Sequence, residues 1–439
     1  MRVLKTPSCC LLLVSLFFVA ACSSSQSDDQ STQAAQSTQA SDATVFEGAR
    51  LIVGDGSAPI EDAAFIVEKN HVTQVGRKGQ VQVPPGAARV DLTGKTVMPA
   101  IIDLHTHMPR MRDALVDQLH RQAYYGVGAV LSLGQDEGDF PFEIRENPIP
   151  GAALFRTAGR GIVMPGGQPG GAQNKVPYLI TTEAEGRKAV QELADRKVDF
   201  VKIWVDDRNR TVKKLTPPMY GAIIEEAHKH NLRVMAHIWD LEDAKGLLRA
   251  GLDGFAHSVR DKDIDDEIMM LFKERPNIFV TPNLPDRDNV VRDFTWIDSI
   301  TPDALKRLQE AEAKRRPDPR EQSAVQERNT AKVNAAGVTI ALGTDSNTGW
   351  GAHAEMADMV AAGMTPAQVI VAATRTPAEI LRLAEQGTVA VGKSADFIVL
   401  DANPLDDITN TRRIARVYIR GTEVDRAALK ARWTVSQTQ

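Results

Sequence analysis

The sequence predicts an α/β fold in which a (β/α)8 barrel of the TIM type is flanked by a small β-sandwich made from both ends of the chain. Eight apolar runs of strand length alternate with helical patterns through the middle of the 439 residues, as in a barrel of parallel strands. Short alternating runs broken by turn residues lie on both sides of that region and are typical of antiparallel β structure. Side chains that bind metals end several of the middle runs, where barrel enzymes carry their active sites.

The first 22 residues have the pattern of an export signal. Arg2 and Lys5 precede an apolar run, Leu11–Ala21, that is too short to cross a bilayer comfortably, and Cys22 follows small residues. This resembles a bacterial lipoprotein signal, in which Cys22 is lipidated; an ordinary cleaved signal is the alternative. The next residue is Ser23 and not aspartate, and in this the chain is similar to outer-membrane lipoproteins. We therefore expect an exported protein that is anchored to the outer membrane and faces the periplasm.

Residues 23–43 are rich in Ser, Gln, Thr and Ala and show no apolar period. Such a segment buries too little apolar surface to fold, so we predict a disordered tether. Residues 44–98 and 386–430 share the texture of short β strands. Because they stand at opposite ends of the chain, we expect them to pair into one sandwich, which leaves residues 99–385 for the catalytic barrel.

The barrel prediction depends on eight strands and the helices between them. The expected strands are Val97–Leu104, Gly128–Leu133, Ala152–Arg156, Phe200–Val205, Val234–Ile238, Gly254–Ala256, Ile278–Thr281 and Val338–Leu342. The clearest helical patterns are Thr182–Arg196, Pro217–His230, Leu241–Ala250 and Pro302–Ala336. An open doubly wound sheet is less consistent with the sequence, because its first strand would lead into a glycine-rich turn.

Charge and cysteine content exclude several kinds of partner and site. The formal net charge is −5, whereas a nucleic-acid-binding protein needs a basic surface. All three cysteines lie at positions 9, 10 and 22, so disulfides and thiolate metal sites are excluded from the rest of the chain. We therefore expect a small-molecule substrate, contact with a membrane through the lipid anchor only, and no nucleic acid. The sequence leaves open whether the chain forms a homo-oligomer.

His105-Thr106-His107 is the strongest local signal for chemistry. Residues two apart near the end of a strand point to the same side, so both imidazoles can face one point. Neutral imidazole is the commonest metal-binding side chain. The motif follows an apolar run that reads as a buried strand, which makes a chance occurrence on a surface strand a poor explanation.

Four further residues fall at the same structural place. Lys202 lies in the fourth expected strand, while His237, His257 and Asp345 end or follow the fifth, sixth and eighth. Each residue taken alone could be an ordinary buried or paired side chain. Together they share the carboxyl-terminal rim of the expected barrel, where catalytic groups gather. The set therefore predicts a metal centre.

These patterns resemble the amidohydrolase superfamily, and in particular its imidazolonepropionase-like and prolidase-like branches. The likeness extends from Ala49 to Gly421. The segments that carry it are Leu51–Gly56, Pro99–His107, Thr374–Ala378, Gly392–Leu400 and Asn403–Leu405. Ala100 stands where the family usually has glycine, which affects none of the expected ligands. The family implies a distorted barrel beside a sandwich, in agreement with the pattern of strands.

The resemblance also implies roles for the residues of the metal centre. His105, His107 and Asp345 resemble ligands of the more buried ion, and His237 and His257 resemble ligands of the more exposed ion. Lys202 resembles the lysine that is carbamylated in binuclear members and bridges the ions; a free ammonium would repel them. We expect two divalent ions, zinc in the first place, or one ion if Lys202 stays an amine.

The expected activity is hydrolysis of a C–N bond by metal-activated water. Asp345 would accept the proton of that water and pass it to the leaving nitrogen. A dipeptide or an N-acyl amino acid is the expected substrate, and Arg287 and Arg292 could bind its carboxylate. The alternatives are a cyclic-amide hydrolase resembling imidazolonepropionase and a lipid-anchored binding protein without turnover. His353 and Glu355 are either neighbours of the metal ligands or helix caps.

Residues 387–394 match the phosphate-loop pattern, which would indicate nucleotide binding, but we interpret them as a turn. Gly387, Gly392, Lys393 and Ser394 satisfy G-x-x-x-x-G-K-S, and nucleotide binding would require a helix to begin there. The next residues, Ala395–Leu400, read as a strand instead. We therefore expect a β turn of the sandwich at this place.

Overall fold

The computed structural model describes residues 41–169, 175–284, 292–315 and 322–435. Cys22 and residues 23–40 of the predicted tether lie outside these ranges, so the lipoprotein signal and the domain boundaries that depend on it stay predictions; Ala43, the last tether residue, already belongs to the first strand. Among the described residues, no helix is both long and apolar enough to cross a bilayer.

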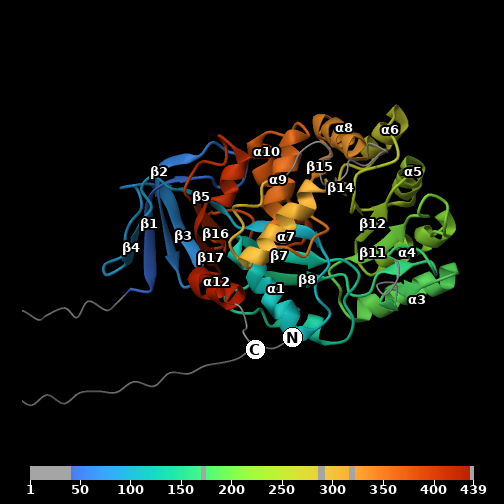
Figure 1. Cartoon of the computed structure of the whole chain (residues 1–439), viewed down its shortest axis with the longest axis horizontal. Coiled ribbons are helices and arrows are strands. Elements are labelled where there is room, and N and C mark those ends of the chain that lie inside the picture. The colour runs from blue at the N-terminus through green and yellow to red at the C-terminus, as the bar shows by residue number, and fades with distance from the viewer. Residues whose placement is uncertain (1–40, 170–174, 285–291, 316–321, 436–439) are drawn as a thin grey trace, which may run out of the picture. The chain divides into compact units, whose positions relative to one another are not determined.

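Strands from the two ends of the chain form one largely antiparallel sheet. Its order is β18-β17-β16-β5-β1-β2-β3, with β4 beside β1, and Figure 1 shows the red C-terminal strands next to the blue N-terminal ones. The strands are β1 (Ala43–Leu51), β2 (Ile60–Glu68), β3 (His71–Arg77), β4 (Ala88–Asp91), β5 (Thr96–Pro99), β16 (Phe397–Leu400), β17 (Ile414–Ile419) and β18 (Thr422–Glu423). The predicted pairing of the two ends is confirmed.

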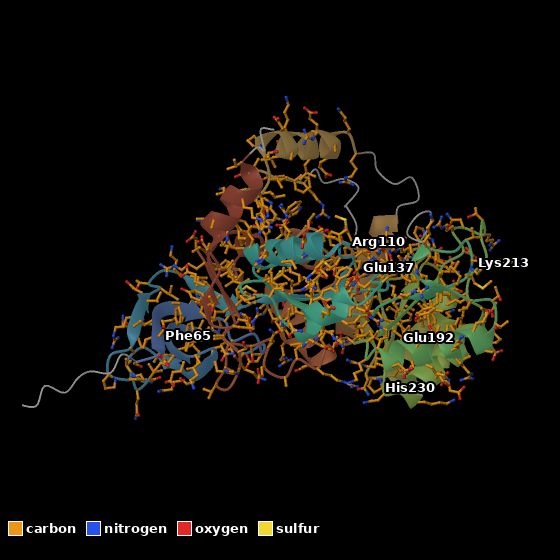
Figure 2. The ribbon with its side chains drawn as sticks, turned by 90° about the horizontal axis from the view of Figure 1, so that it is seen from below. Phe65, Arg110, Glu137, Glu192, Lys213 and His230 are labelled. Carbon is orange, nitrogen blue, oxygen red and sulfur yellow. The ribbon has the colours of Figure 1, made fainter. Side chains whose placement is uncertain are left out.

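Four aromatic residues hold this sheet together from both ends of the sequence. Phe46 stacks on Phe65 with ring centroids 4.9 Å apart, and Phe397 stacks on Tyr418 at 4.6 Å. The two pairs meet edge to face at 5.1–5.2 Å. Such contacts add about 0.5–1.5 kcal/mol each beyond the buried area, so the N-terminal and C-terminal strands depend on one another. Figure 2 labels Phe65 in this sheet.

Parallel strands form the barrel in the middle of the chain. They are β6 (Ile101–Thr106), β7 (Val127–Ser132), β8 (Leu154–Thr157), β9 (Ile162–Val163), β10 (Tyr178–Leu179), β11 (Val201–Val205), β12 (Val234–Ile238), β13 (Gly254–Phe255), β14 (Phe279–Val280) and β15 (Thr339–Ile340). They make two sheets, β6-β7-β8 and β10-β9-β11-β12-β13-β14-β15.

Backbone hydrogen bonds join the two sheets into a closed barrel. Leu104 N donates to Leu342 O at 3.0 Å, which connects β6 to the end of β15, and Asp199 N donates to Thr157 O at 2.9 Å, which connects the start of β11 to β8. Every neighbouring pair within the two sheets is parallel. The predicted (β/α)8 class is confirmed, because β6, β7, β8 and β11 to β15 match the eight expected strands, while the two-residue β9 and β10 are additional. The carboxyl ends of the eight strands therefore share one rim.

Helices follow the barrel strands and cover them. They are α1 (Arg112–Tyr124), α2 (Phe140–Glu146), α3 (Glu183–Asp195), α4 (Pro217–Lys229), α5 (Leu241–Ala250), α6 (Asp266–Glu274), α7 (Pro302–Ala313), α8 (Gln322–Ala335), α9 (Gly351–Ala361), α10 (Pro366–Ala373), α11 (Arg375–Ile380) and α12 (Arg426–Thr434), with a 3-10 turn at Ile408–Arg412. Glu192 of α3 and His230 after α4 lie near each other in Figure 2.

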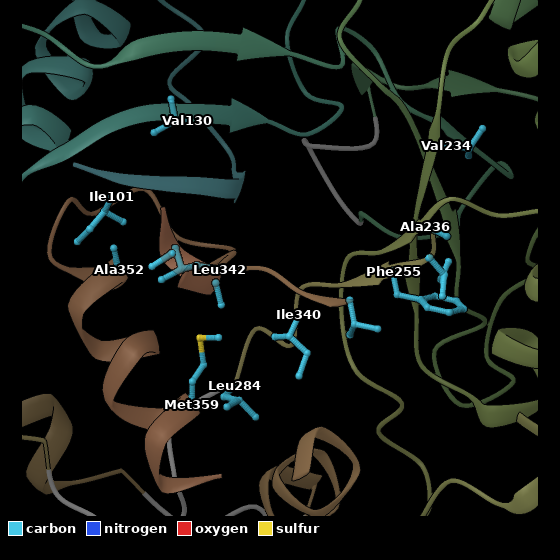
Figure 3. Packing of buried hydrophobic residues seen from close by; sticks show 14 of the residues in the cluster. Ile101, Val130, Val234, Ala236, Phe255, Leu284, Ile340, Leu342, Ala352 and Met359 are labelled. Atoms are coloured by element: carbon cyan, nitrogen blue, oxygen red, sulfur yellow. The ribbon is translucent and has the colours of Figure 1, made fainter. Parts of the chain in front are cut away.

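The outward side chains of the barrel strands pack against these helices. In Figure 3, Ile340 and Leu342 lie beside Met359 of α9; all three are buried. Burying one such side chain contributes about 1.5–3 kcal/mol. The opposite faces fill the barrel, where Phe200 and Met235 belong to one interior cluster. Two residues further along the same strands, the interior positions carry polar side chains.

Two of the predicted elements need correction. The run Val97–Leu104 is two strands, because Thr96–Pro99 pairs with β16 in the terminal sheet and the barrel strand begins at Ile101. The helical pattern Pro302–Ala336 is likewise two helices, α7 and α8. Pro317 and Pro319 lie between them in the sequence, and proline lacks the N–H that a helix interior needs.

Candidate metal centre

Five of the six predicted ligands lie at the carboxyl ends of parallel barrel strands, and Lys202, the second residue of its strand, was expected there but lies deeper in the barrel. Because these strands share one rim, residues far apart in sequence come together there. The six are His105 on β6, His107 just after it, Lys202 on β11, His237 on β12, His257 after β13 and Asp345 after β15.

His105, His107 and Asp345 form a cluster that could hold one metal ion. One potential ligand atom of each lies within 4.8 Å of the others. Oδ1 of Asp345 is 3.0 Å from Nε2 of His107 and 3.4 Å from Nε2 of His105. The predicted two-imidazole motif therefore converges with a carboxylate from the last strand, a donor set that suits zinc.

His257 and His237 continue this cluster on its other side. Nε2 of His257 lies 3.7 Å from Oδ2 of Asp345, so the two carboxylate oxygens of Asp345 face different histidines. The ring of His257 is 5.1 Å from that of His105 and 4.5 Å from that of His237. The arrangement thus extends beyond what one ion requires.

The buried histidines have ring nitrogens that can bind a cation. Nδ1 of His105 contacts the carbonyl oxygen of Ala256 at 3.1 Å and the carboxamide of Asn283, which leaves Nε2 to face the centre. Nε2 of His105 and Nε2 of His257 are both buried, with no hydrogen-bond partner among the described residues. Burial holds the pKa of each ring well below 6.5, so both are neutral at physiological pH and fit a metal.

His237 is oriented by a carboxylate that sequence reasoning did not identify. Its Nε2 lies 3.1 Å from Oδ2 of Asp206, the residue just after β11. A carboxylate on one ring nitrogen orients the imidazole and raises the basicity of the other nitrogen. Nδ1 of His237 has no partner within the described part of the chain and is left for an ion.

Lys202 is fully buried at the base of the site. Its exposed fraction is 0%, and its Nζ has no hydrogen-bond partner in the described structure. Trp204 lies 5.3 Å from Nζ by ring centroid, and Gly134 leaves room for the stem, since a Cβ there would come within 2.9 Å of Lys202 Cγ. Burial lowers the pKa of Lys202 to about 7, so a large fraction is the neutral amine at physiological pH.

Asp345 is held in position by the backbone and by a second buried aspartate. Its φ of +53° lies in the left-handed region, which is uncommon outside glycine and occurs at functional sites. Asp345 N donates to His105 O at 2.7 Å, and Asp103 accepts from Thr344 Oγ1 at 2.7 Å and from His105 N at 3.0 Å. These bonds tie the first barrel strand to the last. Although burial opposes it, the facing His105 and His107 hold the pKa of Asp345 well below its usual range.

Other polar residues at the centre also escaped the sequence analysis. The carboxamide of Asn283, in the left-handed region at φ +44°, contacts Nδ1 of both His105 and His257. Asp103 could have been found, because it precedes His105 by two residues and so points to the same side of its strand. Asn283 and Asp206 lie beyond the ends of their strands, where the alternation that reveals such neighbours stops.

Three of the four expected auxiliary residues have other roles. Arg292 donates to Asp358 on α9, so it is engaged within the protein; Arg287 lies outside the described residues. Nε2 of His353 donates to Tyr125 O at 2.8 Å, and its Nδ1 lies 3.0 Å from Thr411 Oγ1. Glu355 accepts from Leu284 N at 2.9 Å. The structure shows no contact of His353 or Glu355 with the six predicted ligands, and neither caps a helix.

The phosphate-loop pattern is a turn, as predicted. Gly387 and Gly392 both have positive φ, and β16 rather than a helix follows. Nζ of Lys393 donates to Ala384 O at 2.6 Å, so it serves the turn itself. This segment therefore lacks the helix N-terminus that a phosphate site needs.

Known proteins share both the sequence pattern and the fold. Ochratoxinase from Aspergillus niger is 27% identical over 431 residues, covering 85% of this chain and 84% of its own. Imidazolonepropionase from Salinispora arenicola is 25% identical over 372 residues, covering 80% and 88%. The crystal structure of a proposed prolidase from Bifidobacterium longum superposes with a TM-score of 0.71 at 25% identity, covering 89% of this chain and 98% of the other.

The sequence profile of the amidohydrolase family matches residues 96–424, which include the whole barrel and all six predicted ligands. The family is metal-dependent, in keeping with the orphaned nitrogens and the His-His-Asp cluster. The chain belongs to the amidohydrolase family and is a hydrolase.

Proposed function

We propose that this enzyme hydrolyses the C–N bond of a small dipeptide or N-acyl amino acid, using two divalent ions that we take to be zinc. The observation that carries the proposal is the double sharing of Asp345, whose oxygens face His105 and His107 on one side and His257 on the other. The similarity to a proposed prolidase and to ochratoxinase supports an amide-like bond as the target.

In this proposal the ligands divide into two groups. His105, His107 and Asp345 would hold one ion, and His237 and His257 would hold the other. The neutral amine of Lys202, which burial favours, would add carbon dioxide and lose a proton to give a carbamate that supplies further oxygen ligands. If Lys202 stays an amine, its cationic form opposes a second ion and the centre holds one.

A bound divalent ion lowers the pKa of water and polarises a carbonyl group. The chain's own contribution is proton transfer and orientation. Asp345 is 38% exposed through its side chain, so it can reach a water molecule. Its carboxylate takes the proton of the attacking water and delivers it to the nitrogen that leaves. Asp103 and the backbone bond to His105 keep that carboxylate in place.

The test is metal analysis together with a substrate panel of dipeptides, N-acyl amino acids, lactams and esters. We expect two ions per chain and turnover of the first two classes. The Lys202→Ala variant should hold at most one ion, and the Lys393→Ala variant, altered in the distant turn, should match the native enzyme. Absence of amide hydrolysis across the panel in protein with two bound ions would refute the proposal.

Imidazolonepropionase is a relative, so hydrolysis of a cyclic amide is the second proposal. The two differ in metal content as well as in substrate, because a cyclic-amide hydrolase of this kind is expected to need one ion. Turnover of the lactams alone, with one ion per chain, would decide for the second proposal.

We also propose that the protein is exported and carries a lipid on Cys22. The support is the sequence alone, since Cys22 lies outside the described residues. Labelling with a radioactive fatty acid should mark the native chain and not the Cys22→Ser variant, and the label should follow the outer-membrane fraction. A soluble, unlabelled native chain would contradict this.

A further inference from the structure

Arg260 lies at the metal centre with an unused guanidinium. It follows His257 by three residues, and its N–H donates to the carbonyl of Trp239 at 3.0 Å. Trp239 in turn follows His237 by two, so Arg260 stands between the two strand ends that carry these histidines. The guanidinium carbon is 5.3 Å from the centroid of the Trp239 ring, which contributes to holding it.

The side chain of Arg260 has no polar partner within the described ranges. Its Nε is buried without a hydrogen bond, and none of its nitrogens makes an ion pair there. A guanidinium presents five N–H donors, and buried donors in proteins are almost always satisfied. Arg292 also has a buried Nε without a hydrogen bond, but its guanidinium is paired with Asp358; Arg260 has no such ion pair among the described residues, so its guanidinium is open to a partner from outside the chain.

That partner is an anion. Burial lowers the pKa of Arg260 only to about 10, so the group is cationic at physiological pH. Asp345 and Asp206 are the charges that it faces; Asp206 is bonded to His237, and Asp345 faces three histidines. Neither carboxylate forms an ion pair with Arg260, so the planar fork remains available for a carboxylate of the substrate.

We propose that Arg260 binds the free carboxylate of the substrate next to the scissile bond and makes the enzyme selective for acyl and peptidyl amino acids. This inference rests on the proposed function, because it names the group on the leaving side of the amide bond that is cleaved. It also assigns the binding of the carboxylate to Arg260 instead of Arg292. The sequence indicated Arg292 for this role, but in the structure Arg292 is bonded within the protein.

The experiment compares each substrate that carries a free carboxylate with its C-terminal amide. Native enzyme should prefer the acid by about 10–100-fold in kcat/KM, as expected for a hydrogen bond between charged groups. Arg260→Gln should remove this preference, mainly by raising KM for the acid, and should lower kcat/KM for the amide far less than for the acid. Arg260→Lys should recover part of the preference, since it restores the charge without the fork.

Arg412→Gln is the matched control. Arg412 also has a buried Nε without a partner and lies over a tryptophan, Trp296, at 5.0 Å, but the charges that it faces are Arg292, Asp293, Asp358 and Asp407, none of them a predicted ligand. This variant should keep the native preference. Melting temperature and metal content of every variant show that the fold and the centre are intact.

Calorimetry with the product amino acid and its amide gives a readout that needs no turnover. Native enzyme should bind the acid more tightly than the amide, and Arg260→Gln should bind both alike. Equal losses for acid and amide in Arg260→Gln, or no preference in the native enzyme, would overturn the role of Arg260 while amide hydrolysis stands. If no substrate is cleaved, the proposed function fails, and calorimetry alone decides on Arg260.

Discussion

Replacing Lys202 with methionine is expected to stabilise the metal-free protein and to disable the metal-loaded enzyme. Burial lowers the pKa of Lys202 from 10.5 to about 7. Each pKa unit corresponds to about 1.4 kcal/mol, so the difference of about 3.5 between the unfolded and folded chain corresponds to about 5 kcal/mol. Methionine fills a similar volume without charge, so the variant should gain up to that amount in the free energy of unfolding at pH 7.

The stability difference between the native protein and the Lys202→Met variant should depend on pH. The unfolded chain keeps the lysine proton up to about pH 10.5, whereas the folded chain releases it near pH 7. Native stability should therefore rise with pH between about 7 and 10.5, and the advantage of the variant should disappear across the same interval. With metal present the order reverses, because the variant cannot form the bridging carbamate and loses the stabilisation that bound ions provide.

Urea unfolding in the presence of a chelator, in buffers free of carbon dioxide at pH 7, 8, 9 and 10, measures the effect. Lys245→Met is the control, because Lys245 is also buried but pairs with Asp265 and Glu267 at 2.6 and 2.8 Å; this variant should be less stable than the native protein. A Lys202→Met variant that gains nothing at pH 7, or gains equally at pH 10, would refute the idea that Lys202 is a desolvated ammonium.

Three further substitutions test the centre and its surroundings. Asp345→Asn should retain most of the metal yet lower kcat by about 10²–10⁴-fold, and near-normal turnover would contradict its role as the base. Asp206→Asn should weaken metal binding by about 10–100-fold in a chelator competition, because His237 loses the carboxylate at 3.1 Å, whereas Asp207→Asn should leave it unchanged. Burial raises the pKa of Glu355 well above 4.5, so the free energy of unfolding of the native protein should fall as pH rises above that value. At pH 8 the Glu355→Gln variant should be more stable than the native protein by about 1–3 kcal/mol. Equal gains in stability at pH 4 and pH 8 would argue against this.

Element boundaries were predictable where the sequence carries a physical stop. The helix Leu241–Ala250 and the strand Val234–Ile238 have the predicted limits. Gly251 adopts φ +102° directly after that helix, a conformation that glycine tolerates best. By contrast, the apolar run from Val97 to Leu104 carries no such stop, since Pro99 and Ala100 are compatible with a strand edge. Only pairing with β16 shows that two sheets share the run.

Five of the six predicted ligands could be found as a set because each lies at or just after the end of a strand, whereas Lys202 stands second in β11. The apolar run before a ligand locates it along the barrel axis, and parallel strands bring all such ends to one rim. No comparable pattern locates Arg260 and Asn283, because they lie in the segments that follow β13 and β14. In such segments neither a helical period nor strand alternation relates the residue number to the direction of the side chain. The contacts of the supporting aspartates also join distant parts of the sequence. Asp206 and His237 are 31 positions apart, and Asp103 and Thr344 are 241 positions apart.

The division between predictable and unpredictable residues follows the chemistry of the site. Metal ligands must converge on one point, and strand ends supply that convergence in any barrel, so a family pattern preserves their positions. Groups that orient the ligands or select a substrate need only reach the centre from a loop, and many backbone paths allow this. Arg260 illustrates the case: as one of many charged residues in the sequence it carries no signal, yet its guanidinium beside Trp239 makes no ion pair among the described residues, which distinguishes it from paired arginines such as Arg292. In the proposed function, the barrel strands carry the groups for the reaction, and the loops with residues such as Arg260 select the substrate.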